Sequence, residues 1–196
     1  RASELVSFCP LHLPHFAKFY QQGQRDGTNA FIYTRFLIPY LQGYQGWALF
    51  VDGADMLCRA DIAELWALRD PYMAVQVVQH DYKTKHPVKY RGTQMEAQNR
   101  DYPRKNWSSV MLINCAHFDW RDVDPGFVEK TSGADLHRFS FIRDRFIGSL
   151  PMEWNWIADE YGYTPGAKLV HWAAGTPAFE QDRDAPFADE FRAQLD

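Results

Sequence analysis

The stretch that most constrains the fold is residues 46–55, in which a run of apolar residues leads directly into two aspartates. Residues 47–51 have the pattern of a buried strand, and Asp and Gly are poor strand residues, so the strand is predicted to end at Asp52. The glycine and alanine that follow make a tight turn that presents Asp55 at its far end. Aspartate is also a common turn residue, so the pattern leaves open whether these carboxylates only end a strand or hold a ligand.

Strand-like and helix-like segments alternate along the chain, which is typical of an α/β sheet with flanking helices. Strands are predicted at 47–52, 72–79 and 107–115, a short strand followed by a loop within 4–13, and a last strand running into a Gly-Pro turn within 167–179. Helices are predicted at 14–24, 27–44 and 61–68, and 134–161 is expected to be helical and then irregular. The predicted helix at 61–68 opens with Asp61 and has Glu64 three positions later, as in a capping box. The tail, 181–196, is expected to be a solvated helix or partly disordered. No linker or repeat divides the chain, so 1–196 is expected to form a single domain.

The composition excludes some classes of protein. A formal net charge of −4 argues against a nucleic-acid binder, which needs a basic face. No run of about 18 apolar residues is present, so no transmembrane segment is expected, and residues 1–9 lack the apolar region of a signal peptide. The three cysteines lie in apolar or strand-like contexts and are expected to be reduced core thiols. A cytoplasmic location is therefore expected, with peripheral membrane contact left open.

Aromatic residues reach 16%, which suits stacking on a carbohydrate or nucleotide but favours a well-filled core first. Polar residues follow three predicted strands, at 52–55, 80–82 and 171–177. Ligands of open α/β sheets bind beyond the carboxyl ends of strands. Two aspartates with His171 would suit Mn²⁺ better than Mg²⁺, which prefers oxygen ligands alone. The spacing alone favours a different role for His171, that of a hydrogen-bonded core histidine.

The stretch ALFVDGADMLCRADIAELW resembles the strand–DxD–strand–helix signature of GT-A glycosyltransferases of the family-8 type. That family includes glycogenin and bacterial lipopolysaccharide galactosyl- and glucosyltransferases. Four further stretches resemble its motifs in the same order: NAFIYTRFLIPYL the YxR helix, NWSSVMLIN the (F)N(S/A)GVMLIN strand, LPMEWN the LPxxWN motif, and VHWAAGTP the late HFxGxxKPW motif. The resemblance implies the GT-A, Rossmann-like fold of nucleotide-diphospho-sugar transferases, with a mixed, mostly parallel sheet.

The resemblance also implies an activity: metal-dependent transfer of a sugar from a nucleotide-diphosphate sugar to a glycan, a lipid-linked acceptor or another hydroxyl group. Asp52 and Asp55 match the aspartates that hold Mn²⁺ (or Mg²⁺) and the diphosphate, and His171 matches the histidine that completes the metal site. Retention of configuration at the transferred sugar is expected by analogy alone.

Further site residues follow from the same motifs. The residues that match donor contacts are Tyr33, Arg35, Ser108, Ser109 and Gly175. Arg35 is expected near the donor sugar and phosphate, the serines beside the sugar, and the glycine where backbone approaches the phosphates. The predicted catalytic set is Asp52, Asp55, Arg35 and Asp135, the last as the nearest substitute for a missing DQD motif.

The chain departs from the family pattern in several places, which suggests a divergent branch. Its aspartates are separated by one residue more than in DxD, so the turn must bulge to bring both to one ion. The lysine and tryptophan of KPW are missing, and the chain begins at what resembles the second strand, so the first strand–helix unit is expected to be absent. The basic segment 83–106, with Arg104 and Lys105, is either a lid over the donor or a solvated loop.

Two other functions remain open from the sequence. Asp-rich strand ends also serve metal-dependent phosphohydrolases and nucleotidyltransferases, but the haloacid dehalogenase motif and the Gly-rich basic loop are missing. The second is a degenerate, non-catalytic GT-A-like domain that binds carbohydrate or a partner. Retention of Arg35, Asp52, Asp55 and His171 together argues against it.

Overall fold

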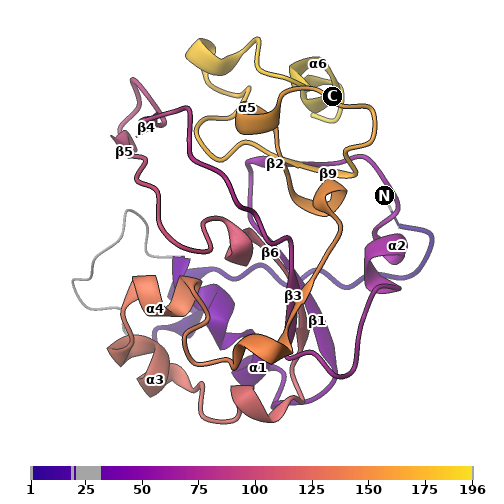
Figure 1. Ribbon diagram of the computed structural model, residues 1–196, viewed down its shortest axis with the longest axis vertical. Helices are drawn as coiled ribbons and strands as arrows, with labels where there is room; N and C mark the ends of the chain where they lie inside the picture. The colour runs from indigo at the N-terminus through magenta and orange to yellow at the C-terminus, as the bar shows by residue number, and fades with distance from the viewer. Residues whose placement is uncertain (1, 19, 21–31, 196) are drawn as a thin grey trace.

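The structure, a computed structural model, describes residues 2–18, 20 and 32–195 (Figure 1). The predicted end of the first helix near Gly23, and the N-caps Thr28 and Asn29 expected for the second, lie outside these residues. The described chain forms a four-stranded sheet in the order β1-β6-β3-β7, a three-stranded sheet in the order β2-β9-β8, and a hairpin of β4 and β5. The strands are β1 Trp47–Val51, β2 Met56–Cys58, β3 Val75–Val77, β4 Val88–Lys89, β5 Ala97–Gln98, β6 Val110–Asn114, β7 Ile147–Ser149, β8 Trp156–Ile157 and β9 Leu169–His171.

The helices are short and pack around the sheets. In Figure 1, α1, α3 and α4 lie beside the four-stranded sheet, and α5 and α6 lie with β2 and β9 at the other end of the molecule. The α-helices are α1 Ile38–Leu41, α2 Ile62–Trp66, α3 Pro125–Lys130, α4 Gly133–His137, α5 Ala158–Tyr161 and α6 Ala188–Arg192. Single turns of 3-10 helix are η1 Leu13–Phe16, η3 Thr34–Leu37, η4 Trp107–Ser109, η5 Phe118–Trp120, η6 Asp144–Phe146, η7 Met152–Asn155 and η8 Glu180–Asp182.

The sheets are mixed, as expected, but they are not mostly parallel. Strand β6 runs antiparallel to both of its neighbours, β1 and β3, and β2 runs antiparallel to β9. The parallel pairs among the described strands are β3 with β7 and β8 with β9. The connection from β3 to β6 carries a hairpin and no crossover helix. The chain therefore re-enters the sheet from the end at which it left, which makes the neighbours antiparallel.

The core lies on both faces of the four-stranded sheet. All five residues of β6 are buried. Met111 and Ile113 pack into one apolar cluster, while Val110 and Leu112 pack into another. Successive side chains of a strand point to opposite faces, so a strand covered on both faces is apolar throughout. This explains the uninterrupted apolar sequence that predicted β6.

Helix α2 begins where its cap predicts. The Asp61 carboxylate accepts a hydrogen bond from the Ala63 amide at 2.9 Å, which satisfies one of the unpaired amides of the first turn. The expected reciprocal contact of a capping box does not form among the described residues. The Glu64 carboxylate instead pairs with the ammonium of Lys168 at 2.9 Å.

The predicted N-terminal strand is wrong, and the prediction for the tail is confirmed only for its helix, α6. Residues 4–10 form no strand, and Leu5 and Phe8 are exposed. The tail is folded rather than solvated, because Phe187 and Phe191 bury their rings in an apolar cluster around Trp172. Two phenylalanines four positions apart lie on one face of a helix, which docks it. Strands β7 and β8 were not expected within 134–161.

The structure bears on two predictions, the absence of a transmembrane segment and the state of the cysteines. No helix among the described residues is long and apolar enough to cross a membrane. The cysteines are free, but they are not all core thiols: Cys115 is buried, Cys58 is half-buried and Cys9 is exposed.

Candidate active site at the junction of the two sheets

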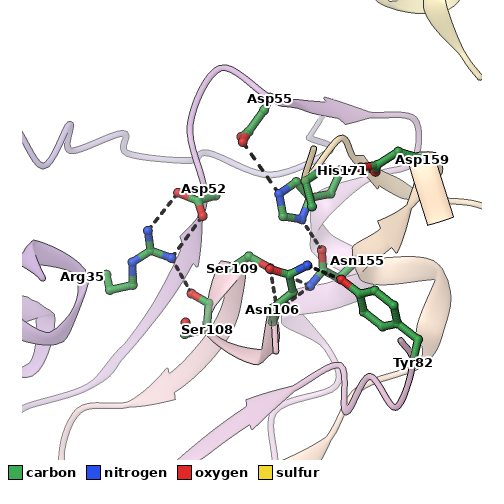
Figure 2. Close-up of polar contacts among 11 residues, drawn as sticks. Arg35, Asp52, Asp55, Tyr82, Asn106, Ser108, Ser109, Asn155, Asp159 and His171 are labelled. Carbon is green, nitrogen blue, oxygen red and sulfur yellow. Dashed lines mark hydrogen bonds and ion pairs between the residues drawn. The ribbon is translucent and has the colours of Figure 1, made fainter. Parts of the chain in front are cut away.

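The two aspartates lie on the turn that joins β1 of the four-stranded sheet to β2 of the three-stranded sheet. The Asp52 amide donates to the Ser109 carbonyl at 2.9 Å, which ties the start of the turn to the end of η4. The Trp172 amide donates to the Asp55 carbonyl at 3.0 Å, which ties its end to the residue after β9. The turn is therefore held from both sheets, and the aspartates stand between them (Figure 2).

Arg35 forms a bidentate salt bridge with Asp52. Its two terminal nitrogens donate to the two Asp52 carboxylate oxygens, each at 3.1 Å. One of these nitrogens also donates to the Ser108 carbonyl at 2.8 Å, and the guanidinium lies 4.6 Å from the centre of the Phe50 ring. Arg35 is only 3% exposed. A charge so buried needs a paired partner, and the planar guanidinium matches the carboxylate geometry.

Asp55 faces His171, which is tied in turn to a buried polar chain (Figure 2). The nearest atoms of Asp55 and His171 are Oδ2 and Nε2, 3.7 Å apart, an ion pair longer than a hydrogen bond. The other ring nitrogen of His171, Nδ1, lies 3.1 Å from Oδ1 of Asn155. The Asn155 amide donates to the Ser109 hydroxyl at 2.8 Å and to the Asn106 carbonyl at 3.2 Å.

The protonation of the Asp55–His171 pair follows from these contacts. Burial disfavours the imidazolium, but the contact with Asp55 and the negative charges of Asp55, Asp52 and Asp159 outweigh it and raise the pKa of His171. Burial likewise disfavours the carboxylate of Asp55, yet the contact and charge of His171, with a smaller effect from Arg35, hold its pKa below the ordinary value. Both shifts favour the form of the pair in which an imidazolium faces a carboxylate.

The predicted metal ligands fit an ion in part. Bonds of about 2.1 Å from a metal to its ligands place neighbouring ligand atoms about 3 to 4 Å apart, so one divalent ion can span Asp55 and His171. Asp52 lies three residues from Asp55, but both of its carboxylate oxygens accept hydrogen bonds from Arg35. No three His, Cys, Asp or Glu side chains gather closely enough to hold an ion within the described part of the chain. The three-ligand site stays a prediction.

The other predicted site residues fall into two groups. Ser108 and Ser109 lie at the centre: both are buried, and the Ser108 hydroxyl lies 2.6 Å from Nδ1 of His137. Tyr33 lies in the core, where its ring packs against Gly133. Asp135 is exposed, and its carboxylate accepts hydrogen bonds from the nearby Ser132 and Ser140 hydroxyls.

Gly175 is buried four residues beyond His171, and its place next to a phosphate stays a prediction. A Cβ atom there would overlap the Asp182 carboxylate, so the glycine allows a close approach of backbone to that side chain. Among the tryptophans near this end of the chain, Trp154 and Trp172 are buried in the core. Trp156 is half-buried and donates to the Gly162 carbonyl at 2.8 Å.

Two residues of the centre were not predicted. Asn155 is fully buried and connects His171 to Ser109, although it stands inside the LPMEWN motif. Asp159 is half-buried and accepts from the Ala173 amide at 3.1 Å with one carboxylate oxygen, while its Oδ2 is buried with no hydrogen-bond partner among the described residues. Burial raises the pKa of Asp159. The only signal for Asp159 in the sequence was an acid four residues after that motif, which no local pattern separates from a helix N-terminus.

His80 and Asp81 belong to the polar stretch 80–82 that follows a predicted strand. His80 is buried, with Nδ1 3.2 Å from the Tyr161 hydroxyl, and its Nε2 has no hydrogen-bond partner among the described residues. Burial, with a smaller effect from the charge of His171, lowers the pKa of His80 to about 3. Asp81 is exposed.

Comparisons with known proteins support the fold. No family model matches the chain. Protein CDI of Arabidopsis thaliana is 43% identical over 174 residues, which are 86% of this chain and 65% of that protein. The chain thus spans less than two thirds of the length of this curated relative. The apo structure of WbbM, a bifunctional glycosyltransferase, matches 87% of this chain and 36% of its own, with a TM-score of 0.58 and 16% sequence identity. At this identity the likeness is one of fold, so the chain has the mixed α/β fold of part of a glycosyltransferase.

Proposed function

We propose that the protein is a metal-dependent glycosyltransferase of the GT-A type that moves a sugar from a nucleotide-diphosphate sugar to a hydroxyl group of a glycan or lipid-linked acceptor. The observation that carries the proposal is the meeting of Arg35, Asp52, Asp55 and His171 at one junction of two sheets (Figure 2). The fold shared with part of WbbM supports it. The family-8 likeness, retention of configuration and a cytoplasmic site of action belong to the same proposal.

Breaking the bond between a sugar and a diphosphate leaves negative charge on the departing phosphate. Groups that are already oriented toward that charge stabilise it without reorganisation. Arg35 supplies a fixed positive charge, because its guanidinium is locked by Asp52 and by the Ser108 carbonyl. Mn²⁺ held by Asp52, Asp55 and His171 would supply a Lewis acid to the same leaving group.

The carboxylates need such an ion if a diphosphate is to bind beside them. Asp52 and Asp55 alone would repel an anionic ligand, and a divalent cation reverses the local charge. The Asp55–His171 pair already holds two ligand types at a separation that one ion can span. Asn155 orients the imidazole through its other nitrogen, which is the usual way in which a ligating histidine is held.

The second candidate is a non-catalytic domain that binds a carbohydrate or a protein partner. The observation that favours it is the closed pair of Arg35 and Asp52, in which both oxygens of the carboxylate are engaged without an ion. If Asp52 serves only to bind Arg35, the aspartates do no more than stabilise the turn between the sheets. The two candidates differ in one respect that can be measured, which is nucleotide binding that depends on Mn²⁺.

The test is calorimetric titration of the purified protein with UDP and with GDP, each with and without Mn²⁺. Binding of one nucleotide that requires Mn²⁺ and is lost in Asp55→Ala would support the transferase and identify the base. Asp184→Ala is the matched control, because the Asp184 side chain is 91% exposed and distant from the turn in sequence. Failure of both nucleotides to bind, with or without Mn²⁺, would favour the non-catalytic domain.

A further inference from the structure

The basic segment 83–106 is fastened to helix α5 rather than free in solvent. The Lys85 amide donates to the Glu160 carboxylate at 2.9 Å, and the Lys85 ammonium donates to the Glu160 carbonyl at 2.7 Å. Nε2 of His86 lies 2.9 Å from the carbonyl of Asp159. Glu160 is only 3% exposed, so the anchor is inside the protein. Strand β4 thus begins from a fixed point next to Asp159, whose carboxylate belongs to the candidate site.

The far end of β4 is fixed as well. The Tyr90 amide donates to the Ala174 carbonyl at 2.6 Å, three residues after His171. The Tyr90 ring meets the Phe179 ring edge-on, with centres 6.4 Å apart. Tyr90 also has a φ of 51°, a left-handed conformation that a bulky residue adopts only when its surroundings hold it there. Residue 89 is therefore held in place beside the segment that carries His171.

Lys89 differs from the other cations of this segment. Arg104 pairs with Asp144 at 2.7 Å and Lys105 pairs with Asp101 at 3.3 Å, so the two residues expected to act on the donor are engaged elsewhere. Lys89 is half-buried, yet within the described residues no hydrogen bond or ion pair joins its ammonium to another group. The segment's other unpaired cations are exposed: Lys83, Arg91 and Arg100.

The charge of Lys89 interacts with the carboxylates of the candidate site. Burial, and less strongly the charge of Lys105, lower the pKa of Lys89, whereas the carboxylates of Asp159, Asp55 and Asp52 act on it in the opposite sense. The same Asp55 and Asp52 charges also act on the neighbouring Tyr90. Such effects require proximity in a partly dry environment. The ammonium thus lies within electrostatic reach of the aspartates from the hairpin side.

We propose that Lys89 is an anion-binding residue of the site and that its ammonium contacts the diphosphate of the donor. The inference rests on the proposed function for the identity of the ligand, but not for the anion site itself. The Arg35 guanidinium is already engaged by Asp52. Lys89, by contrast, has no hydrogen-bond or ion-pair partner to give up among the described residues. A half-buried ammonium without a partner gains a charge-assisted hydrogen bond when an anion arrives.

The experiment uses inorganic pyrophosphate, UDP and GDP as separate probes, each with Mn²⁺ and at constant ionic strength, because surface charges are screened by salt. Binding is measured by calorimetry for the wild-type protein, Lys89→Met, Lys89→Arg and Lys83→Met. Lys89→Met is expected to weaken pyrophosphate binding about 10- to 100-fold, the range for a lost hydrogen bond to a charged group. Lys89→Arg is expected to retain most of the binding, and Lys83→Met to behave as wild type.

The outcomes separate this inference from the proposed function. Equal pyrophosphate binding by wild type and Lys89→Met would overturn the role of Lys89, as would the absence of pyrophosphate binding by the wild type. Pyrophosphate binding that depends on Lys89, with no gain in affinity for UDP or GDP, would keep the anion site and reject the nucleotide-sugar function. A thermal melt of each variant checks that loss of binding is not loss of fold.

Discussion

Replacing Asn155 with alanine tests whether the buried polar chain holds the site together. The Asn155 side chain is fully buried and makes three hydrogen bonds, to Ser109, to the Asn106 carbonyl and to His171. Three bonds at about 1 kcal/mol each, together with about 1 kcal/mol for the buried His171 nitrogen left unpaired, predict a loss of about 4 kcal/mol. Loss of the bond from Asn155 costs the Ser109 hydroxyl less free energy, because this hydroxyl still donates to the Asn106 carbonyl at 2.7 Å.

The assay is urea unfolding followed by circular dichroism, with the midpoint and slope compared between variants. Asn114→Ala is the matched control. It removes a nearly buried asparagine that makes one side-chain bond, to the Pro71 carbonyl at 3.2 Å, and is expected to cost about 1 kcal/mol. Equal losses for the two variants would refute the reasoning, because the network would then add nothing beyond a single bond. A double-mutant cycle with Ser109→Ala would measure the coupling directly.

Three further predictions concern the fold around the site. Burial, with smaller effects from neighbouring positive charges, lowers the pKa of His80 and of His137 from 6.5 to about 3, so both are neutral when folded and gain protons on unfolding below pH 6.5. Stability is therefore expected to fall as the pH drops from 6.5 toward 3, measured as a falling urea midpoint. Phe191→Ala is expected to cost about 3 to 5 kcal/mol in the same assay, because the ring is buried against the C-terminal cluster. Gly175→Ala is expected to lower the melting temperature by overpacking against Asp182, and Asp182→Ala is expected to restore it.

Each of these three predictions would be contradicted by a specific result. A urea midpoint that stays constant from pH 6.5 to 4 would contradict neutral buried histidines. Phe191→Ala is compared with Leu195→Ala, whose side chain is 71% exposed, and similar losses would mean that α6 is not docked. If the double variant at 175 and 182 melts no higher than the single glycine variant, the contact with the carboxylate is not the cause of the loss.

Local chemistry predicted the elements whose signals are contained within a few residues. The end of β1 at an aspartate and the Asp61 cap of α2 each depend on neighbours in sequence, and both are confirmed. The apolar run of β6 likewise predicted a strand, because both of its faces are covered. The docked tail also had a local signal in the spacing of Phe187 and Phe191, but its many charged residues favoured the solvated interpretation.

The features that were missed depend on partners far away in sequence. A strand after the aspartates was implied by the resemblance, but the pairing of β2 with β9 joins residues more than a hundred positions apart and was not predicted. The direction of β6 depends on how the whole segment 83–106 folds back. The roles of Asn155 and Lys89 depend on groups that lie on other elements. An asparagine after a tryptophan, or a lysine in a basic loop, has no distinctive local sequence signal. Their roles could be recognised only once burial and partners were known.

The turn from Asp52 to Asp55 has a mechanical consequence, because it is one of the places where the chain crosses from one sheet to the other. The chain crosses back between β2 and β3, and the segment from β7 through η7 to β8, which carries Asn155, crosses a third time. The two sheets can therefore move relative to each other at this junction only by changing the distances among Asp52, Asp55 and His171. A ligand that touches both aspartates would restrict the relative movement of the two sheets at this junction. Amide hydrogens of β2 and β9 would then exchange more slowly with solvent when it is bound, although the ligand touches neither strand.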